Sequence, residues 1–387
     1  MTRTTDRNAP GDKDETGAVQ WLPRPVLTDF CRDVFIAHGL THDDAALSAA
    51  VLVAADARGI PSHGVARLAR YVGGLETGSI VADAAPQVLH DTPLSLALDA
   101  QGAMGAPVSQ RAMNAAIDKA RATGAGFATV RDSNHFGIAG WYAMAALEHD
   151  MIGIAMTNTA ALGVPSHGTQ AMFGTNPIAF AAPAEREHAF VLDMSTTAVT
   201  YGKIEVYARQ GKPLPAGWAS DALGRQAVDA SSLWESMNRY AGGGLHPLGG
   251  AGTALGGHKG YGLATMVDIL SGVLSGHGFG QHLHDTPSAM GRVGHFFAAF
   301  RIDLFRQAAE FRRDMDQLLS ELRTSPPAQG QSRIYYAGLK EIEREAEAAE
   351  SGVMVADNVV DVLIAEGARV GVALPPGIDW RRQEPRS

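Results

Sequence analysis

The pattern of hydrophobic and polar residues divides this 387-residue chain into a polar start, a helical section, a strand-rich centre and a helical end. Residues 1–20 contain almost no bulky apolar side chains, which predicts a disordered tail. Residues 21–89 and 304–387 carry helical patterns, whereas residues 90–303 alternate short apolar runs with helices. We therefore expect a helical domain built from both termini and a sheet-based domain formed by residues 90–303.

Short apolar runs in the centre have strand length and are bounded by Gly, Pro, Asn or Asp. They read PLSLALDA, GFATVRD, MIGIAMTN, PIAFAAP, AFVLDMS and GHFFAAFRID. Helices are expected between some of them, at 137–149 and 258–275, and beyond them at 304–323 and 339–350. The fold class is therefore mixed α/β.

Two helices are expected ahead of this centre. Thr41 is an N-cap candidate before AALSAAVLVAADAR, and that helix is expected to stop near Gly59. Ser62 stands where the next N-cap belongs, and the second helix is expected to end at Gly73 and Gly74.

Composition and charge exclude several classes of protein. Acidic residues outnumber lysine and arginine by 41 to 32, the formal net charge is −9, and no basic run occurs, so we expect no nucleic-acid partner. The sequence contains no stretch of about 18 apolar residues, so we expect no membrane span. The polar N-terminus lacks a secretory signal and Cys31 is the one cysteine, so we expect a cytoplasmic protein without an internal disulfide.

Familiar nucleotide and nucleophile motifs are missing. The 44 glycines form no G-x-G-x-x-G; the nearest match, GGAGTALGG, has Leu255 in place of the third glycine. A nucleophile elbow needs G-x-S-x-G, whereas Ser62 and Ser166 both lie in G-x-x-S-x-G. The segments 59–64 and 163–168 repeat this pattern with unlike flanks, which indicates similar loop chemistry rather than a duplicated domain.

Histidines are frequent enough to raise the question of a metal site. The densest group is His277, His282 and His284, followed by Asp285, in a glycine-rich segment. Such a segment is typical of a surface loop with solvated side chains, and HExxH is absent, so we expect no metal.

Seven glycine-punctuated polar motifs remain, and their order along the chain is more specific than any one of them. They are ADARGIPSHGVARLARYV, DSNHFGIAGWYA, GTNPIAFAAP, LDMSTTAVTYGKI, GWASDALG, PLGG and GGHKGYGLATMVDILSGVLSG. Together they resemble the malate/L-lactate dehydrogenase family over about residues 25–303.

This resemblance implies a fold, a reaction and a coenzyme. The family uses a sheet-based cofactor domain that is not a Rossmann fold, which explains the missing glycine fingerprint. Its members transfer a hydride between NAD or NADP and a small 2-oxo, 2-hydroxy or cyclic imino carboxylic acid. The resemblance also implies a homodimer whose partner is a small carboxylic acid substrate.

Residue roles follow from the same resemblance. His63 is expected to be the proton donor, held by Ser62 in a relay that Asp193 completes, and His135 is its competitor for that role. Arg67 lies four residues after His63, so a helix would place both side chains on one face, where the guanidinium could hold a carboxylate. Arg70, seven residues after His63, is the competing candidate, and the family resemblance favours Arg67. Thr159 and Lys203 are further substrate candidates. Cofactor contacts are expected from His135, Phe136, Gly137, Ile138, Thr175, Asn176, Asp193, Met194, Ser195, His258 and Lys259.

One segment departs from the family pattern. The proline-glycine-glutamate turn common in the family is replaced here by Tyr336-Ala337-Gly338-Leu339-Lys340. Loss of the acidic residue favours NADP, because repulsion of a 2′-phosphate is removed. Two alternatives to the enzyme remain open: a non-catalytic ligand-binding relative of the same fold, and a Ser-His hydrolase.

Overall fold

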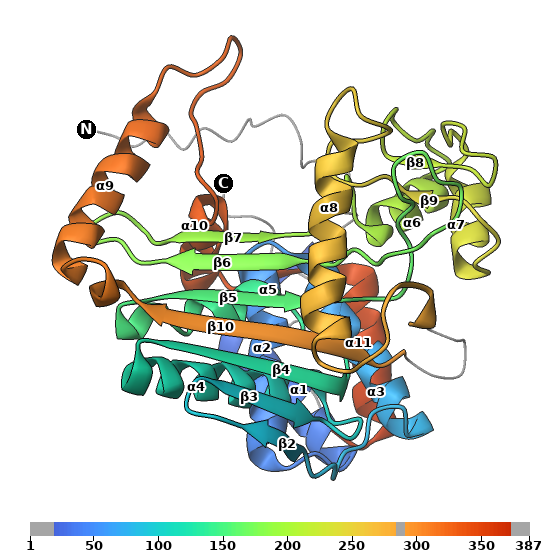
Figure 1. Ribbon diagram of the computed structural model, residues 1–387. Helices are drawn as coiled ribbons and strands as arrows, with labels where there is room; N and C mark the ends of the chain where they lie inside the picture. Colours follow the sequence, from blue (N-terminus) through green and yellow to red (C-terminus); the bar gives the residue numbers. More distant parts are fainter. Residues whose placement is uncertain (1–18, 284–290, 373–387) are drawn as a thin grey trace.

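A seven-stranded sheet forms the centre of the computed structural model, which describes residues 19–283 and 291–372 (Figure 1). Its strands are β2 (Gln87–Asp91), β3 (Ser95–Asp99), β4 (Ala125–Ser133), β5 (Met151–Thr157), β6 (Ile178–Ala182), β7 (Phe190–Met194) and β10 (Val293–Arg301). Their order is β2-β3-β4-β10-β5-β6-β7, and β3 and β4 are the one parallel pair in it. This mostly antiparallel arrangement differs from the parallel sheet of a Rossmann domain.

Helices cover both faces of this sheet. The alternation of side chains along β10 places Phe297 and Ala299 against α4 (Gly105–Thr123) and α5 (Ala139–Met144), in one buried cluster. Phe296 points to the opposite face, where it packs with α8 (Gly257–Val267), which continues into a π-helical turn at Asp268–Val273. In Figure 1, α8 crosses the front of the sheet, and the helices at the chain ends lie behind it.

The two ends of the described chain share one hydrophobic core. β1 (Val19–Leu22) pairs antiparallel with β11 (Val353–Ala356). The core beside this pair joins residues 22–104 with residues 348–363. Its helices are α1 (Arg24–Ala37), α2 (His42–Ala57), α3 (Leu68–Thr77), α10 (Leu339–Ser351) and α11 (Asp357–Arg369).

A separate lobe follows β7 in the sequence. It contains α6 (Tyr201–Gln210), α7 (Ala230–Asn238), β8 (Ala219–Ser220) and β9 (Gly244–Leu245). These elements surround a small core of their own that includes Ile204 and Leu233, and they lie at the upper right of Figure 1.

The region between α2 and α3 differs from the sequence prediction. Ser62 does not cap an α-helix: it lies in a 3-10 turn, Pro61–His63, and a second turn, Val65–Arg67, separates it from α3. Pro61 and Gly64 interrupt regular helical hydrogen bonding, which explains the shorter turns. The prediction that Gly73 and Gly74 end the helix is wrong, because α3 continues to Thr77 and is capped by Gly78, whose φ is +72°.

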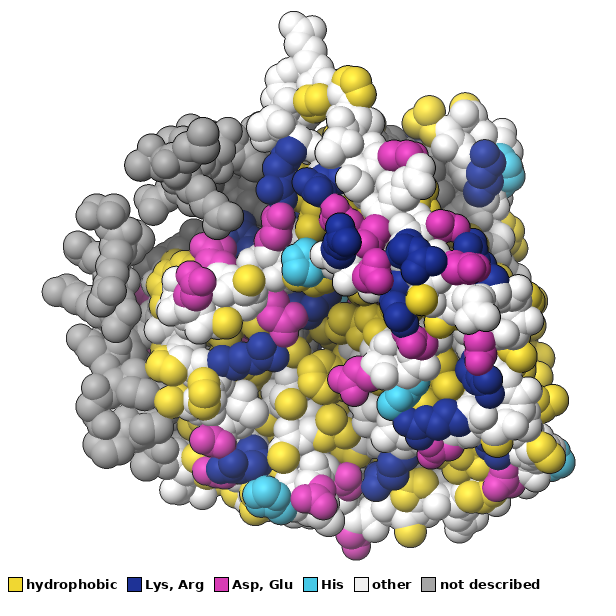
Figure 2. Space-filling model, turned by 90° about the vertical axis from the view of Figure 1, so that its left-hand side faces the viewer, with side chains coloured by type: hydrophobic (Ala, Val, Ile, Leu, Met, Phe, Trp, Pro, Cys, Tyr) yellow, Lys and Arg dark blue, Asp and Glu magenta, His cyan; other side chains and the backbone are white. Residues whose placement is uncertain are grey.

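One end of the molecule shows how its surface charge is arranged. Figure 2 looks onto this end, and residues of both signs alternate there around a hollow rather than forming a basic surface. α9 (Ala308–Thr324) is held by ion pairs such as Arg323–Glu187 at 2.8 Å and Arg306–Asp314 at 2.7 Å. Such mixed charge offers no continuous track for a phosphate backbone on this face.

Candidate active site

A cluster of polar side chains is built around the two 3-10 turns. Ser62 Oγ lies 2.9 Å from His63 Nδ1, and Arg67 Nε donates to the carbonyl oxygen of Ser62 at 2.7 Å. His63 and Arg67 therefore do not lie one α-helical turn apart, as predicted, because each ends a separate 3-10 turn. The tighter turns nevertheless bring the two close enough for the charge of Arg67 to act on the imidazole.

Burial and a positive neighbour keep His63 neutral. Burial and, to a smaller extent, the nearby Arg67 guanidinium together lower the pKa of His63 to about 4. Both effects disfavour the imidazolium. At neutral pH the unliganded site therefore holds an uncharged imidazole beside a fixed positive charge.

His135 faces His63 from the sheet side. It lies in the loop between β4 and α5, and the two imidazole rings are stacked with their centroids 5.4 Å apart. Gly137 N donates to His135 Nδ1 at 3.3 Å, so that nitrogen is an acceptor, and the hydroxyl of Tyr71 donates to it at 2.5 Å. The neutral ring of His135 consequently carries its proton on Nε2.

Tyr71 was missed at the level of sequence. It is a buried residue of α3 whose ring also lies 5.8 Å from that of His135. Its position in the apolar stripe of LARYVGGLET suggests ordinary core packing, and nothing in that pattern identifies a hydroxyl that holds a histidine.

Asp56 is the second residue that the sequence analysis missed. It lies in α2, 8% exposed, and its Oδ2 accepts a hydrogen bond from Val65 N at 2.6 Å. A Cβ on Gly64 would come within 2.1 Å of Asp56 Oδ1, so only glycine fits above this carboxylate. Asp56 thus fastens the turn that carries His63, and burial raises its pKa to about 7. The sequence does contain a sign of this role, because Asp56 is an acidic residue within the otherwise apolar helix AALSAAVLVAADAR.

Asp193 lies at the end of β7 in a different pocket. Its Oδ2 accepts from Gly140 N at 2.7 Å, and the groups that influence its charge are Arg58 and Glu341. Among the contacts of residues 19–283 and 291–372, none joins Asp193 to Ser62 or His63. Surrounding protein raises its pKa to about 6, although its side chain opens onto the pocket.

The pocket at Asp193 has a volume of about 220 Å³ and lies between α5, β7 and the loop before α10. Two residues with predicted cofactor contacts, Ile138 and Asp193, line it. The altered 336–340 loop forms another wall, with Tyr335 and Lys340. Leu339 does not face this pocket: it is 4% exposed in a core cluster with Leu319, so Lys340 is the changed residue that a ligand there would meet.

Thr159, Thr175 and Asn176 form a second polar group at the ends of β5 and β6. Thr159 Oγ1 accepts from Thr175 N at 2.9 Å, and Asn176 Oδ1 accepts from Thr159 N at 3.1 Å. Asn176 Nδ2 donates to Ala264 O of α8 at 2.9 Å. These bonds fix the backbone where the predicted cofactor contacts are expected.

Three further candidates are exposed. Lys203, in α6, has its Nζ 5.8 Å from the ring centroid of Trp218, and His258 and Lys259 lie in the first turn of α8.

Phe136 instead is buried between Tyr142 and His295, with ring centroids 4.8 and 4.6 Å away, so its contacts are those of a core residue. Gly137 adopts a φ of +81°, and Met194 and Ser195 are half-buried after Asp193.

Neither a metal centre nor a membrane segment emerges from the described chain. Across residues 19–283 and 291–372, no three His, Cys, Asp or Glu side chains are grouped as metal ligands. Nor does any helix in those ranges have the length and hydropathy to cross a membrane. His284 and Asp285 of the histidine-rich segment lie outside the described residues, as do most of residues 1–20 and the chain end after 372.

Two stacked imidazoles beside an arginine, on a mostly antiparallel sheet without a Rossmann turn, make up a site that can bind an acid and transfer a proton. The family model for malate/L-lactate dehydrogenase matches residues 22–364. The chain therefore belongs to the malate/L-lactate dehydrogenase family, and it is a nicotinamide-dependent oxidoreductase.

Individual relatives agree with this assignment. The chain is 42% identical over 351 residues to malate dehydrogenase of Pyrococcus abyssi, covering 91% of this chain and 95% of the relative. It is 32% identical over 260 residues to a Δ1-pyrroline-2-carboxylate/Δ1-piperideine-2-carboxylate reductase of Pseudomonas syringae pv. tomato, covering 67% and 72%. The solved structure of malate dehydrogenase from Pyrococcus horikoshii OT3 superimposes with a TM-score of 0.84 at 37% identity, covering 93% of this chain and 99% of that one. The expected family and non-Rossmann fold are confirmed.

Proposed function

We propose that the protein transfers a hydride between NAD(P)H and a small 2-oxo, 2-hydroxy or cyclic imino carboxylic acid, with the substrate held between His63, His135 and Arg67. The stacked imidazoles, 5.4 Å apart beside Arg67, are the observation that carries the proposal. Hydride transfer to a carbonyl or imine needs a proton donor and an orienting cation for the adjacent carboxylate, and this cluster supplies both.

Arg67 links substrate binding to the protonation of His63. Its charge contributes to the low pKa of His63, about 4. A carboxylate that pairs with the guanidinium neutralises this charge and adds a negative one, so the pKa of His63 rises on binding. The imidazole then gains the proton that reduction requires, and in oxidation it accepts that proton back.

His135 contributes orientation. Tyr71 and Gly137 both donate to Nδ1, so Nε2–H remains available to donate to the carbonyl oxygen or imine nitrogen of the substrate. His135 stays the competitor of His63 for the proton-donor role, because the two rings face the same space. Ser62 fixes the orientation of the His63 ring at Nδ1.

The donor set of the 220 Å³ pocket fits the adenosine end of a nicotinamide coenzyme. Lys340 offers a cation for phosphate, Tyr335 offers an aromatic face, and Asp193 offers a carboxylate for a ribose hydroxyl. Arg58 also lines the pocket, where it is paired with Glu345 at 2.7 Å. The coenzyme, when bound, supplies the hydride. Leu339-Lys340 stands where the family has an acidic residue, and of this pair Lys340 lines the pocket, so we include a preference for the 2′-phosphate of NADPH in the proposal.

A relay from Asp193 through Ser62 to His63 also belongs to the proposal, and it requires Asp193 to leave its bond with Gly140 at the wall of the coenzyme pocket. Thr159 and Lys203 remain proposed substrate contacts, and His258 and Lys259 remain proposed contacts for anionic coenzyme groups.

Assembly and location complete the proposal. Apolar side chains such as Leu94 and Phe127 are 48% and 41% exposed on the sheet near its β2–β3 edge, which suits a homodimer contact. The one cysteine, Cys31, is unpaired and buried, as is usual in a reducing cytoplasm. Light scattering at micromolar protein concentration tests the dimer, and a monomer mass contradicts it.

The reaction itself is tested with a panel of 2-oxo, 2-hydroxy and cyclic imino acids at 340 nm, using both coenzymes. We expect oxidation of the reduced coenzyme with at least one acid. The two alternatives are not favoured, since the relatives are dehydrogenases and reductases. Labelling of Ser62 by a fluorophosphonate without any coenzyme oxidation would support the hydrolase instead.

A further inference from the structure

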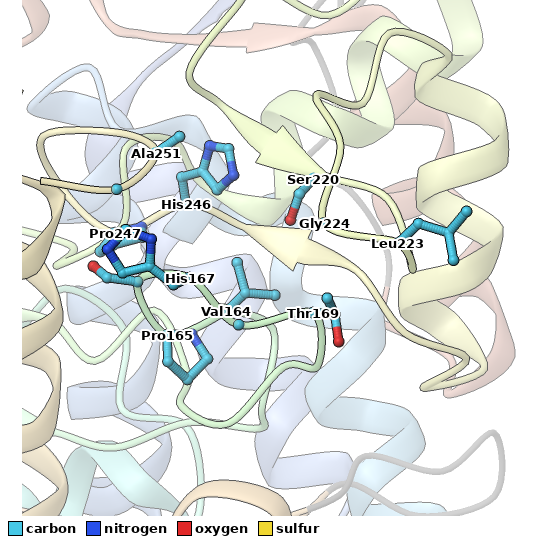
Figure 3. A pocket seen from close by; sticks show the side chains of 13 residues that line it. Val164, Pro165, His167, Thr169, Ser220, Leu223, Gly224, His246, Pro247 and Ala251 are labelled. Carbon is cyan, nitrogen blue, oxygen red and sulfur yellow. The ribbon is translucent and has the colours of Figure 1, made fainter. Parts of the chain in front are cut away.

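The second Pro-Ser-His-Gly segment, residues 165–168, lines a cavity that the proposed reaction does not use. This cavity has a volume of about 370 Å³ and lies between the 163–169 loop and the β8–β9 lobe (Figure 3). Its volume is in the range of small-molecule pockets. Among the described residues that line it, none is Asp, Glu, Lys or Arg, so its polar groups are hydroxyls and imidazoles.

Three of these polar groups have no hydrogen-bond partner within the described part of the chain. They are Ser166 Oγ, Ser220 Oγ and His246 Nδ1. Ser220 is 1% exposed and His246 is 7% exposed, so bulk solvent does not reach them freely. Each unsatisfied buried group costs about 1–3 kcal/mol, and three of them in one cavity indicate that a polar occupant, water or ligand, completes the site.

Strand pairing places two of these groups together. Ala219 pairs with Leu245 and Ser220 with Gly244, so His246 lies diagonally across from Ser220 on the same face of the two-stranded ladder. Such diagonal neighbours are about 7 Å apart at Cβ or Cα, and Figure 3 shows both side chains directed into the cavity. Two hydrogen bonds of about 2.9 Å to one small group can span this gap.

The imidazole of His246 determines what that group must be. Burial lowers the pKa of His246, while a hydrogen bond to the backbone of Gly217 acts in the opposite direction. A neutral ring carries one proton, and the tautomer with that proton on Nε2 leaves the unpartnered Nδ1 as an acceptor. An occupant with an N–H group completes the hydrogen bonding of this tautomer.

The loop itself is held in an uncommon conformation. His167 has a φ of +68°, in a turn closed by a 2.8 Å hydrogen bond from Gly168 N to Pro165 O. A left-handed conformation at a residue with a side chain costs of the order of 1 kcal/mol and is found preferentially at functional sites. The turn directs the His167 ring to the cavity wall beside Pro247 (Figure 3).

We propose that this cavity is a second ligand site, which binds a small uncharged amide whose N–H donates to His246 Nδ1 and whose carbonyl accepts from Ser220 Oγ. Apolar wall residues such as Val164 and Pro165 suit a planar ring or short alkyl group attached to the amide. Carboxylate ligands are disfavoured, because no cation lines the cavity to compensate their charge. The site is therefore selective against the acids that the enzyme turns over.

Calorimetric titration of the full-length protein with benzamide and benzoate tests this proposal. NADPH is kept saturating, so that the coenzyme site is filled. We expect benzamide to bind with one site per chain and benzoate to bind at least tenfold more weakly. Failure of benzamide to bind beside the saturating coenzyme, or equal binding of benzoate, would overturn the proposal.

Ser220→Ala locates the site, and Ser232→Ala, at an exposed serine of α7, is the matched control. Ser220→Ala should weaken benzamide binding about tenfold, leave kcat unchanged and raise the melting temperature of the ligand-free protein, since an unsatisfied hydroxyl is removed. The control should bind benzamide like the wild type. Unchanged binding in Ser220→Ala would place the amide elsewhere and refute the assignment. Because the readout is amide binding, a failed search for the hydride acceptor would leave this test intact.

Discussion

Asp56, the buried carboxylate under the His63 turn, makes the stability of the protein depend on pH in a way that one substitution isolates. Its pKa lies at about 7 in the folded protein, against an ordinary value of 3.8. A raised pKa means that the folded state binds the proton more tightly than the unfolded chain does. The contribution of the neutral carboxyl to the free energy of unfolding is therefore fully present below about pH 3.8, and it is lost as the pH rises through about 7.

The magnitude follows from the linkage relation. The carboxyl ionises more readily in the unfolded chain than in the folded protein, and this lowers the free energy of unfolding. Compared with a side chain that cannot ionise, the reduction is about 1.7 kcal/mol at pH 5 and about 4.3 kcal/mol at pH 8. Asp56→Asn keeps an oxygen that accepts from Val65 N but cannot ionise. The free energy of unfolding of the variant, minus that of the wild type, should therefore increase by about 2.6 kcal/mol from pH 5 to pH 8.

Urea denaturation of both proteins at pH 5 and pH 8, at constant ionic strength, measures this difference. Other titrating groups cancel because both proteins share them. Asp361→Asn, at an exposed position of α11, is the control and should show a constant difference from wild type. A difference for Asp56→Asn that also stays constant within about 0.5 kcal/mol would refute the claim that this carboxyl is neutral in the native protein at pH 5.

The remaining predictions concern the reaction. His63→Ala should lower kcat by about 10²–10⁴-fold with little change in coenzyme affinity, by steady-state kinetics and fluorescence titration; a larger loss in His135→Ala would reverse their roles. Arg67→Ala should raise KM for the acid by about 10–100-fold with a smaller effect on kcat, and an unaltered KM would contradict the carboxylate contact. Lys340→Ala should raise KM for NADPH more than KM for NADH, and equal changes would remove Lys340 from the discrimination between coenzymes.

Sequence patterns predicted the large elements well because each is locally determined. The runs GFATVRD and GHFFAAFRID became the paired strands β4 and β10, and AALSAAVLVAADAR became most of α2. Ordered motifs identified the family, and the comparisons confirm it. β2 was missed because its residues Gln87–Asp91 are all exposed, so no apolar alternation marks it.

Contacts within the site were less predictable because they join segments far apart in the sequence. Tyr71 meets His135 across 64 positions, and no local pattern connects a helix tyrosine with a loop histidine. Asp56 acts through a backbone N–H nine residues away, across a turn whose 3-10 geometry depends on Pro61 and Gly64. The position of Asp193 beside Gly140 likewise depends on how α5 packs against β7.

Isotope transfer tests the central claim most directly. The protein is incubated with coenzyme deuterated at the transferring carbon of its nicotinamide, together with the 2-oxo or imino acid that gives the fastest oxidation at 340 nm. Mass spectrometry should find one deuterium in the 2-hydroxy or amino acid product, with the transfer suppressed in His63→Ala or His135→Ala. A product that forms without deuterium, or a coenzyme that is never oxidised with any acid of the panel, would contradict the account.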